Sequence, residues 1–279
     1  MNGTSSTPSS TSSSFYTEFS PVHRKKRKSR APKEREPLLA IVQRLREELG
    51  HDDWLSECQQ ILVESLAKAS LATISEVICL GLGSPAASAT ARVQLAFLLA
   101  ICENLNIDRA KVFLYDPVFT AEDMTLFAEL QVQLLTENKD AAYVIDHPTL
   151  CFMPHCDLAL YENIIRANWS KTRLPNLVLV ANRLADYVES NPRHQLETKA
   201  PFLLNLAPTL QCHPFPASRP WPTAFNNTAL QHAGGEDVYE IMISTDEFNA
   251  RGALRWRVKN DEMTDKHGGT AWMEMQIEG

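Results

Sequence analysis

The segment that most constrains the fold is residues 76–106, which carries the pattern of a buried strand, a glycine turn and a helix in direct succession. Val77 to Leu80 form an apolar run without polar alternation, which is typical of a strand covered on both faces in a parallel sheet. Gly81-Leu82-Gly83 ends the run, and Ser84-Pro85 predicts a helix start because serine is a favoured N-cap and proline is tolerated in the first turn. Apolar side chains then recur at helical spacing up to Leu105, enough for one broad stripe. This order predicts the opening of a doubly wound α/β fold.

Further strands and helices alternate along the chain after this opening. The next predicted strands are residues 111–115, 132–135, 149–153 and 176–180. Thr120 and Asp123 form a Thr-x-x-Asp cap for a helix before the third strand, and Asp157 is placed to cap the helix after the fourth. On that last helix, Glu162 and Arg166 lie four residues apart and predict a modest stabilising pair. The pattern predicts an α/β, Rossmann-like three-layer sandwich with a mainly parallel sheet of about five or more strands.

Four regions are predicted along the 279 residues. Residues 1–36 are a disordered Ser/Thr-rich and basic arm, residues 37–71 are a helical N-terminal extension, and residues 72–190 form the Rossmann-like domain. Residues 191–279 are predicted to be a Pro-rich and poorly defined C-terminal extension. Seven prolines fall between Pro192 and Pro222, and proline disrupts the interior of helices and strands. Edge strands are expected in this extension only near residues 238–243 and 255–259.

The charge of the chain is unevenly distributed. Eight Lys/Arg and three Glu give residues 1–36 a net charge of +5, so the remainder carries −12 and the whole chain −7. The basic run from His23 to Arg30 has the composition of a solvated, self-repelling tail, with a nuclear import signal as the alternative. The acidic body argues against nucleic acid as the main ligand.

No apolar run approaches the roughly 20 residues of a membrane-spanning helix, and the N-terminus has no signal-peptide core. We therefore expect a cytoplasmic protein without a membrane segment, with nuclear import as an alternative through the basic run. Six cysteines without a CxxC spacing predict reduced thiols rather than disulfides.

Chemistry in a doubly wound sheet belongs at the carboxyl ends of the strands. Gly81, Gly83 and Ser84 follow the first strand and Asp116 follows the second, an arrangement that can hold a phosphate or carboxylate and a ribose. These residues predict a cofactor site for S-adenosylmethionine or another adenosine nucleotide. The match is incomplete, because Asp116 lies 33 residues past Gly83 rather than about 20 after the fingerprint. The alternative is a tight strand–helix connection beside an Asp-Pro turn.

His155-Cys156-Asp157 follows the fourth strand and offers catalytic candidates. His155 has a side chain suited to proton transfer near neutrality, and Asp157 is its acidic neighbour; the alternative is that both cap and pack the turn. Three adjacent residues do not easily converge on one ion, and no second His/Cys pair has zinc spacing, so no metal site is predicted.

A longer set of motifs carries a resemblance to a known family. The segments GLGSPAASATARVQLAFLLA, KVFLYDPVFTAED, LLTEN, PTLCFMPHCDLALYENIIRANW and NLVLVAN resemble the Sensitivity to Red-light Reduced (SRR-like) family over about residues 70–190. The resemblance implies regulation of circadian rhythm and clock-gene expression, and heme biosynthesis in animals, without an agreed reaction. It also implies that the family's characteristic polar positions are residues 81–84, 116–117, 137–138, 155–157 and 161–163.

Two classes of function remain open from the sequence. The first is a regulatory protein that binds unidentified protein partners on a Rossmann-like scaffold; the resemblance favours it. The second is an enzyme or sensor for an adenosine-type cofactor, such as an S-adenosylmethionine-dependent methyltransferase. The fold alone does not separate them.

Overall fold

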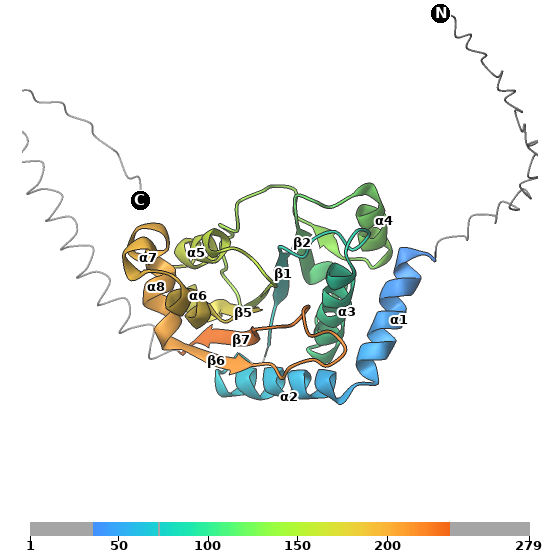
Figure 1. The fold of residues 1–279 in the computed structure, drawn as a ribbon, viewed down its shortest axis with the longest axis horizontal. Helices are drawn as coiled ribbons and strands as arrows, with labels where there is room; N and C mark the ends of the chain where they lie inside the picture. Colours follow the sequence, from blue (N-terminus) through green and yellow to red (C-terminus); the bar gives the residue numbers. More distant parts are fainter. Residues whose placement is uncertain (1–35, 72, 235–279) are drawn as a thin grey trace, which may run out of the picture. The chain divides into compact units, whose positions relative to one another are not determined.

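The structure is a computed structural model that describes residues 36–71 and 73–234. Within them, seven strands form one sheet in the order β3-β2-β1-β4-β5-β7-β6 (Figure 1). The first five strands pair in parallel, and β7 runs antiparallel to both of its neighbours. The predicted α/β fold with a mainly parallel sheet is therefore confirmed. The strands are β1 (Glu76–Leu80), β2 (Val112–Tyr115), β3 (Gln133–Leu134), β4 (Thr149–Met153), β5 (Leu177–Asn182), β6 (Leu210–Pro214) and β7 (Thr228–Ala233).

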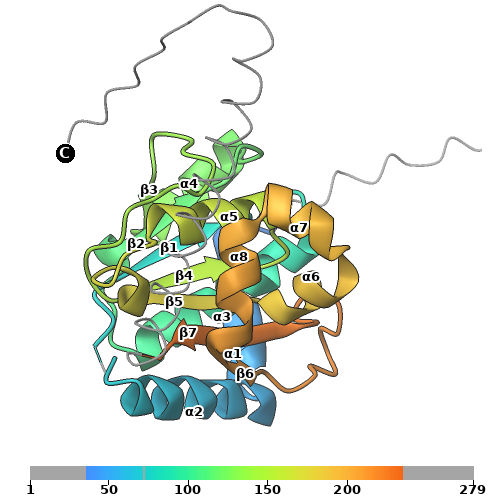
Figure 2. The ribbon, with the colours of Figure 1, turned by 90° about the vertical axis from the view of Figure 1, so that its left-hand side faces the viewer.

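Helices cover both faces of the sheet and complete the three layers (Figures 1 and 2). Along β1, Val77 and Cys79 enter one hydrophobic core while Ile78 and Leu80 enter the other, which explains why the strand has no polar alternation. The first core is packed by α1 (Leu38–Gly50), α2 (Asp53–Lys68), α3 (Ala89–Asn104) and α4 (Ala121–Glu129). The second is packed by α5 (Leu158–Ala167), α6 (Leu184–Ser190), α7 (Arg193–Lys199) and α8 (Pro201–Leu206).

Helix α3 is buried on all sides rather than along one stripe. Every residue from Val93 to Cys102 is buried, because α3 lies between the sheet and α1 (Figure 1). A helix that is apolar all round is typical of such an interior position. The N-terminal helix α1 thus covers α3, and α3 covers the sheet.

Side-chain caps fix the starts of α2, α3, α4 and α5. The predicted cap at Thr120 and Asp123 is confirmed as a reciprocal capping box, and Asp157 caps α5 by accepting from the Leu160 N–H at 2.9 Å. The predicted start at Ser84 was wrong. Helix α3 is capped by Ser88, which accepts from the Ala91 N–H at 3.2 Å, because the Ser84 hydroxyl is bound elsewhere.

The structure differs from the predicted boundary at residue 190. Residues 193–233 build α7, α8, β6 and β7, and β7 pairs with β5 in the main sheet. The prolines fit because they lie at element ends or in connections. Pro192 precedes α7, Pro201 is the first residue of α8, Pro214 is the last residue of β6, and three more lie between β6 and β7. The two predicted edge strands after residue 237 and the basic run His23–Arg30 lie outside the described residues.

All six cysteines of the chain fall in the described part and are free thiols there. None of the helices between residues 36 and 234 is long and apolar enough to cross a membrane, counting the residues that the structure describes.

Candidate functional site

The carboxyl ends of β1 and β4 form the switch point of the sheet. From β1 the chain first builds outward through β2 and β3, and it then returns to place β4 on the opposite side of β1. Ligands of open α/β sheets bind at such a point. The turns that follow these two strands, residues 81–83 and 154–156, touch each other there, since the Cys156 thiol donates to the Leu80 carbonyl at 3.5 Å.

The two glycines of the first turn are required for different reasons. Both have positive φ, +69° at Gly81 and +74° at Gly83, a region that residues with a side chain rarely adopt. A Cβ at Gly81 would lie 2.5 Å from Cys156 Sγ, whereas a Cβ at Gly83 would find its nearest neighbour at 3.8 Å. Gly81 therefore allows the two turns of the switch point to pack against each other.

The Asp116 carboxylate contacts the glycine turn, and the cofactor hypothesis requires these two features to lie close together. Its Oδ2 accepts from the Gly83 N–H at 2.8 Å, and its Oδ1 accepts from the Val118 N–H in its own turn at 3.1 Å. Both carboxylate oxygens therefore accept hydrogen bonds from backbone N–H groups. A carboxylate has about four lone-pair sites, so this half-buried group retains capacity for further donors.

Beneath the turn lies Asp123, a fully buried carboxylate. It accepts from the Ser84 hydroxyl at 2.6 Å, from the Ala86 N–H at 2.7 Å, and from both the N–H and the hydroxyl of Thr120 at 2.8 Å. Burial alone would raise its pKa, but the hydrogen bonds from Ser84, Thr120 and Ala86 outweigh burial and hold the pKa of Asp123 below its usual value. Asp123 is therefore an ionised anchor, and Ser84 is engaged inside the protein.

His155 lies exposed in the second turn with φ +55°, and both its backbone and its ring are bound. Its N–H donates to Asn182 Oδ1 at 3.1 Å, and its Nε2 is 3.2 Å from the carbonyl oxygen of Ala224. Because a carbonyl only accepts, Nε2 carries the proton in this contact. The role of proton acceptor would fall to Nδ1.

Two neighbours of His155 serve the local structure. Asp157 is exposed and caps α5 through the Leu160 N–H. Burial, with smaller contributions from Asp157 and Asp116, raises the pKa of the Cys156 thiol to about 12. Cys156 is thus protonated at neutral pH and lacks the thiolate of a nucleophilic cysteine.

Glu162 pairs with Arg166, as predicted, and also binds a second helix. Its side chain is 1% exposed and accepts from the N–H groups of Phe202 at 3.4 Å and Leu203 at 2.9 Å, as well as from Arg166 at 3.0 Å. The carboxylate therefore binds the first turn of α8, a contact between residues 40 and 41 positions apart that the helical spacing of Glu162 and Arg166 does not reveal.

The structure thus joins Gly83 to Asp116 directly and links Ser84 to the same loop through Asp123. His155 lies on the facing turn. Sequence reasoning missed the role of Asp123, whose pattern indicated only a local cap, and the part of Ala224, for which the sequence holds no signal. Among the described residues, no group of three or more His, Cys, Asp or Glu side chains is arranged to hold a metal ion.

Comparison with known proteins extends over most of the chain. The SRR1 domain family matches residues 42–232. An SRR1-like protein of Mus musculus is 32% identical over 170 residues, which are 61% of this chain and 68% of the mouse protein. Protein SENSITIVITY TO RED LIGHT REDUCED 1 of Arabidopsis thaliana is 30% identical over 114 residues, covering 41% of this chain and 42% of the plant protein. An SRR1-like protein of Drosophila melanogaster is 30% identical over 122 residues, covering 44% of this chain and 43% of the fly protein. This chain belongs to the SRR1 domain family.

Proposed function

We propose that this protein is a regulatory member of the SRR1 domain family that acts by binding protein partners on a rigid Rossmann-like scaffold. Following the family resemblance, its role is to regulate circadian rhythm and clock-gene expression and to support heme biosynthesis. The carboxyl ends of its strands serve to hold the scaffold together in this proposal.

One observation carries the proposal: the polar positions characteristic of the family bind the protein's own backbone. Asp116 holds Gly83 and Val118, and Glu162 holds the start of α8. The Tyr161 hydroxyl donates to the Met153 carbonyl at 2.7 Å, and Asn163 Nδ2 donates to the Asp140 carbonyl at 2.9 Å. A working site directs such groups into an open pocket. Polar side chains that form hydrogen bonds with the protein's own backbone instead favour a scaffold function.

The experiment is complementation in cells that lack their own SRR1 domain protein and carry a clock-driven luciferase reporter. We expect the intact chain to restore the period of the reporter and the cellular heme content. Asp116→Ala, matched to the intact chain in abundance, should restore both as well, because a scaffold needs no ligand at this position. A folded intact chain that restores neither readout would contradict the proposed role.

A second candidate is favoured by the position of Asp116. An acidic side chain after β2, bonded to the glycine turn at the switch point, is placed where a ribose would lie in an adenosine-type site. If S-adenosylmethionine or an adenosine nucleotide binds there, Asp116→Ala should weaken binding by about 1.5–3 kcal/mol, the range for a hydrogen bond to a charged group. Loss of complementation in Asp116→Ala at normal abundance would favour this candidate over the first.

A further inference from the structure

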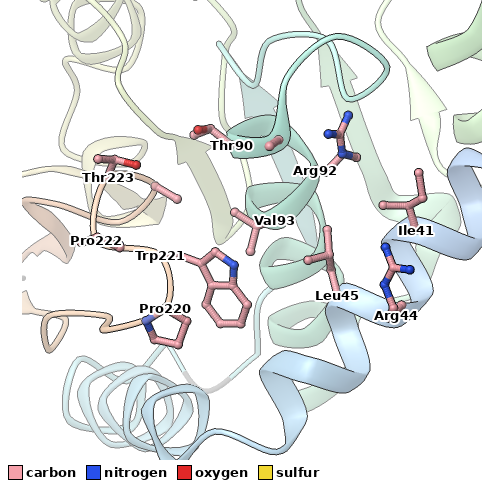
Figure 3. Close-up of a pocket in the computed structure, with 12 residues that line it drawn as sticks. Ile41, Arg44, Leu45, Thr90, Arg92, Val93, Pro220, Trp221, Pro222 and Thr223 are labelled. Carbon is pink, nitrogen blue, oxygen red and sulfur yellow. The ribbon is translucent and has the colours of Figure 1, made fainter.

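A cavity of about 330 Å³ lies on the face of the sheet covered by α1 and α3, and none of its lining residues belongs to the turns at residues 81–83 and 154–156. Its walls come from α1, from the first turns of α3 and from residues 220–224 of the connection between β6 and β7 (Figure 3). Its volume is at the lower end of the range for small-molecule sites, roughly 300–1,000 Å³.

The walls combine an aromatic ring with aliphatic side chains. Figure 3 shows the indole of Trp221 between Pro220 and Val93, with Leu45 of α1 on the far side. Trp221 is half-buried, and its backbone N–H donates a hydrogen bond to Ser218 Oγ at 3.2 Å, which fixes the backbone at this position. A flat apolar body placed here would contact the indole and the aliphatic wall together.

Two guanidinium groups line the cavity, and they differ in their partners. Arg92 Nη1 donates to the Pro85 carbonyl at 2.7 Å and to the Ala86 carbonyl at 3.4 Å. In the described part of the chain no carboxylate pairs with Arg92, whereas Arg44 pairs with Glu36 at 2.9 Å and Glu48 at 3.6 Å on the exposed side of α1.

Arg92 therefore carries an uncompensated charge with donors to spare. Its bonds to Pro85 and Ala86 use one nitrogen, and a guanidinium has five N–H donors and is always ionised in proteins. The first turn of α3, which lines the cavity at Ala89 and Thr90, contains no acidic residue that would neutralise it. A carboxylate, phosphate or sulfonate suits this fork of donors.

We propose that this cavity binds a small molecule with a planar aromatic body and one anionic group. The aromatic body packs against Trp221 and Val93, and the anionic group pairs with Arg92, with Arg44 as a second cation. Its lining shares no residue with the turns at residues 81–83 and 154–156, and the proposal stands or falls independently of the regulatory function proposed above.

The cavity adjoins the switch point through Ala224. Ala224 lines the cavity, and its carbonyl oxygen accepts from Gln94 Nε2 at 2.8 Å and contacts His155 Nε2 at 3.2 Å.

The test is fluorescence titration of the full chain with 8-anilinonaphthalene-1-sulfonate and with its neutral counterpart N-phenyl-1-naphthylamine. We expect saturable binding of the sulfonate that is about tenfold tighter than that of the neutral probe, the size of one charge-assisted hydrogen bond. Arg92→Gln and Arg44→Gln should each weaken the sulfonate only, and Trp221→Ala should weaken both probes. Arg193→Gln is the matched control, because Arg193 is likewise an exposed arginine paired with a glutamate four residues on.

Equal affinity for the two probes, or sulfonate binding unchanged in both Arg44→Gln and Trp221→Ala, would overturn the site. An equal loss in Arg193→Gln would also overturn it, since the effect would then be one of overall charge. Arg44 is half-exposed, so its variant keeps the test valid if Arg92→Gln fails to fold. Displacement of the sulfonate by 1-naphthoate or by 1-naphthyl phosphate then identifies the preferred anion, and failure of both to displace it contradicts the proposal.

Discussion

At the scale of single residues, the two glycines after β1 are open to separate tests. Gly83→Ala should lower the free energy of unfolding by about 1–2 kcal/mol, the cost of a positive φ for alanine. Its new Cβ adds no steric clash, because the nearest atom lies at van der Waals distance. Gly81→Ala should cost more by about 1–3 kcal/mol, since its Cβ would lie 2.5 Å from Cys156 Sγ and the turns would have to separate. Urea unfolding measures both free energies.

The control for this comparison is Cys156→Ala, which removes the sulfur that Gly81→Ala would strike. In the double variant, the extra cost of Gly81→Ala should largely disappear. If Gly81→Ala and Gly83→Ala cost the same and Cys156→Ala changes neither, the close packing of the two turns is not what requires glycine at residue 81.

Asp123 is the other residue whose role is measurable on its own. Asp123→Asn should lower the free energy of unfolding by about 2–3 kcal/mol at pH 7, because its new amide faces groups that are themselves donors. Its pKa is lowered in the fold, so the ionised group stabilises the fold above its unfolded pKa of about 3.9, and this stabilisation is lost as pH falls through the lowered pKa. The difference in the free energy of unfolding between the parent and the variant should therefore narrow as the pH falls below about 3.9 and through the lowered pKa of Asp123.

Ser84→Ala is the milder companion to this change. It removes one donor and leaves the carboxylate with its other partners, so its cost should be about 1 kcal/mol. A constant difference between the parent and Asp123→Asn from neutral to acid pH would show that the carboxylate is not an ionised anchor.

At the scale of elements, Glu162 connects α5 to α8. Glu162→Ala should cost about 3 kcal/mol, because it leaves the N–H groups of Phe202 and Leu203 without their buried partner. Hydrogen–deuterium exchange should speed up in α8 before it does in β4 or β5. Arg166→Gln is the control; it should cost less than Glu162→Ala, because the Arg166 side chain is half-exposed and the variant leaves Glu162 with its two backbone partners. If Arg166→Gln costs as much as Glu162→Ala, the glutamate acts through the surface pair instead.

Some strands of the sheet could be predicted from the sequence and others could not. The parallel strands were predictable because they lie in short apolar runs, which are almost fully buried in β4 and β5. Strand β3, at the edge of the sheet, has an exposed Gln133 and a half-buried Leu134, and only its place in the apolar-rich residues 132–135 indicated it. Strand β6 was not predictable, since its Leu210–Pro214 sequence is polar, mostly exposed and closed by a proline. Its pairing partner β7 was missed as well, because the prolines before it suggested irregular structure. These prolines lie at element ends or in the connection between β6 and β7, where they displace no interior hydrogen bond.

At the scale of the whole molecule, the candidate site was only partly predictable. The sheet topology places residues after β1 and β2 together, so the meeting of Gly83 and Asp116 followed from the strand order. The hydrogen-bond partners of Ser84 and His155 could not be predicted from the strand order. Ser84 bonds to Asp123, 39 residues away, and His155 contacts Ala224, 69 residues away. Such long-range hydrogen bonds depend on tertiary packing and leave no periodic trace in the sequence.

The central claim is that the polar groups at the switch point hold the scaffold and bind no adenosine ligand. Isothermal titration calorimetry of the full chain with S-adenosylmethionine, NAD and ATP tests it most directly, with the thermal midpoint followed in parallel. The account predicts no saturable heat and no thermal shift with any of the three. Saturable heat with one of them, lost in an Asp116→Ala variant that keeps its secondary structure and its thermal midpoint, would contradict the account.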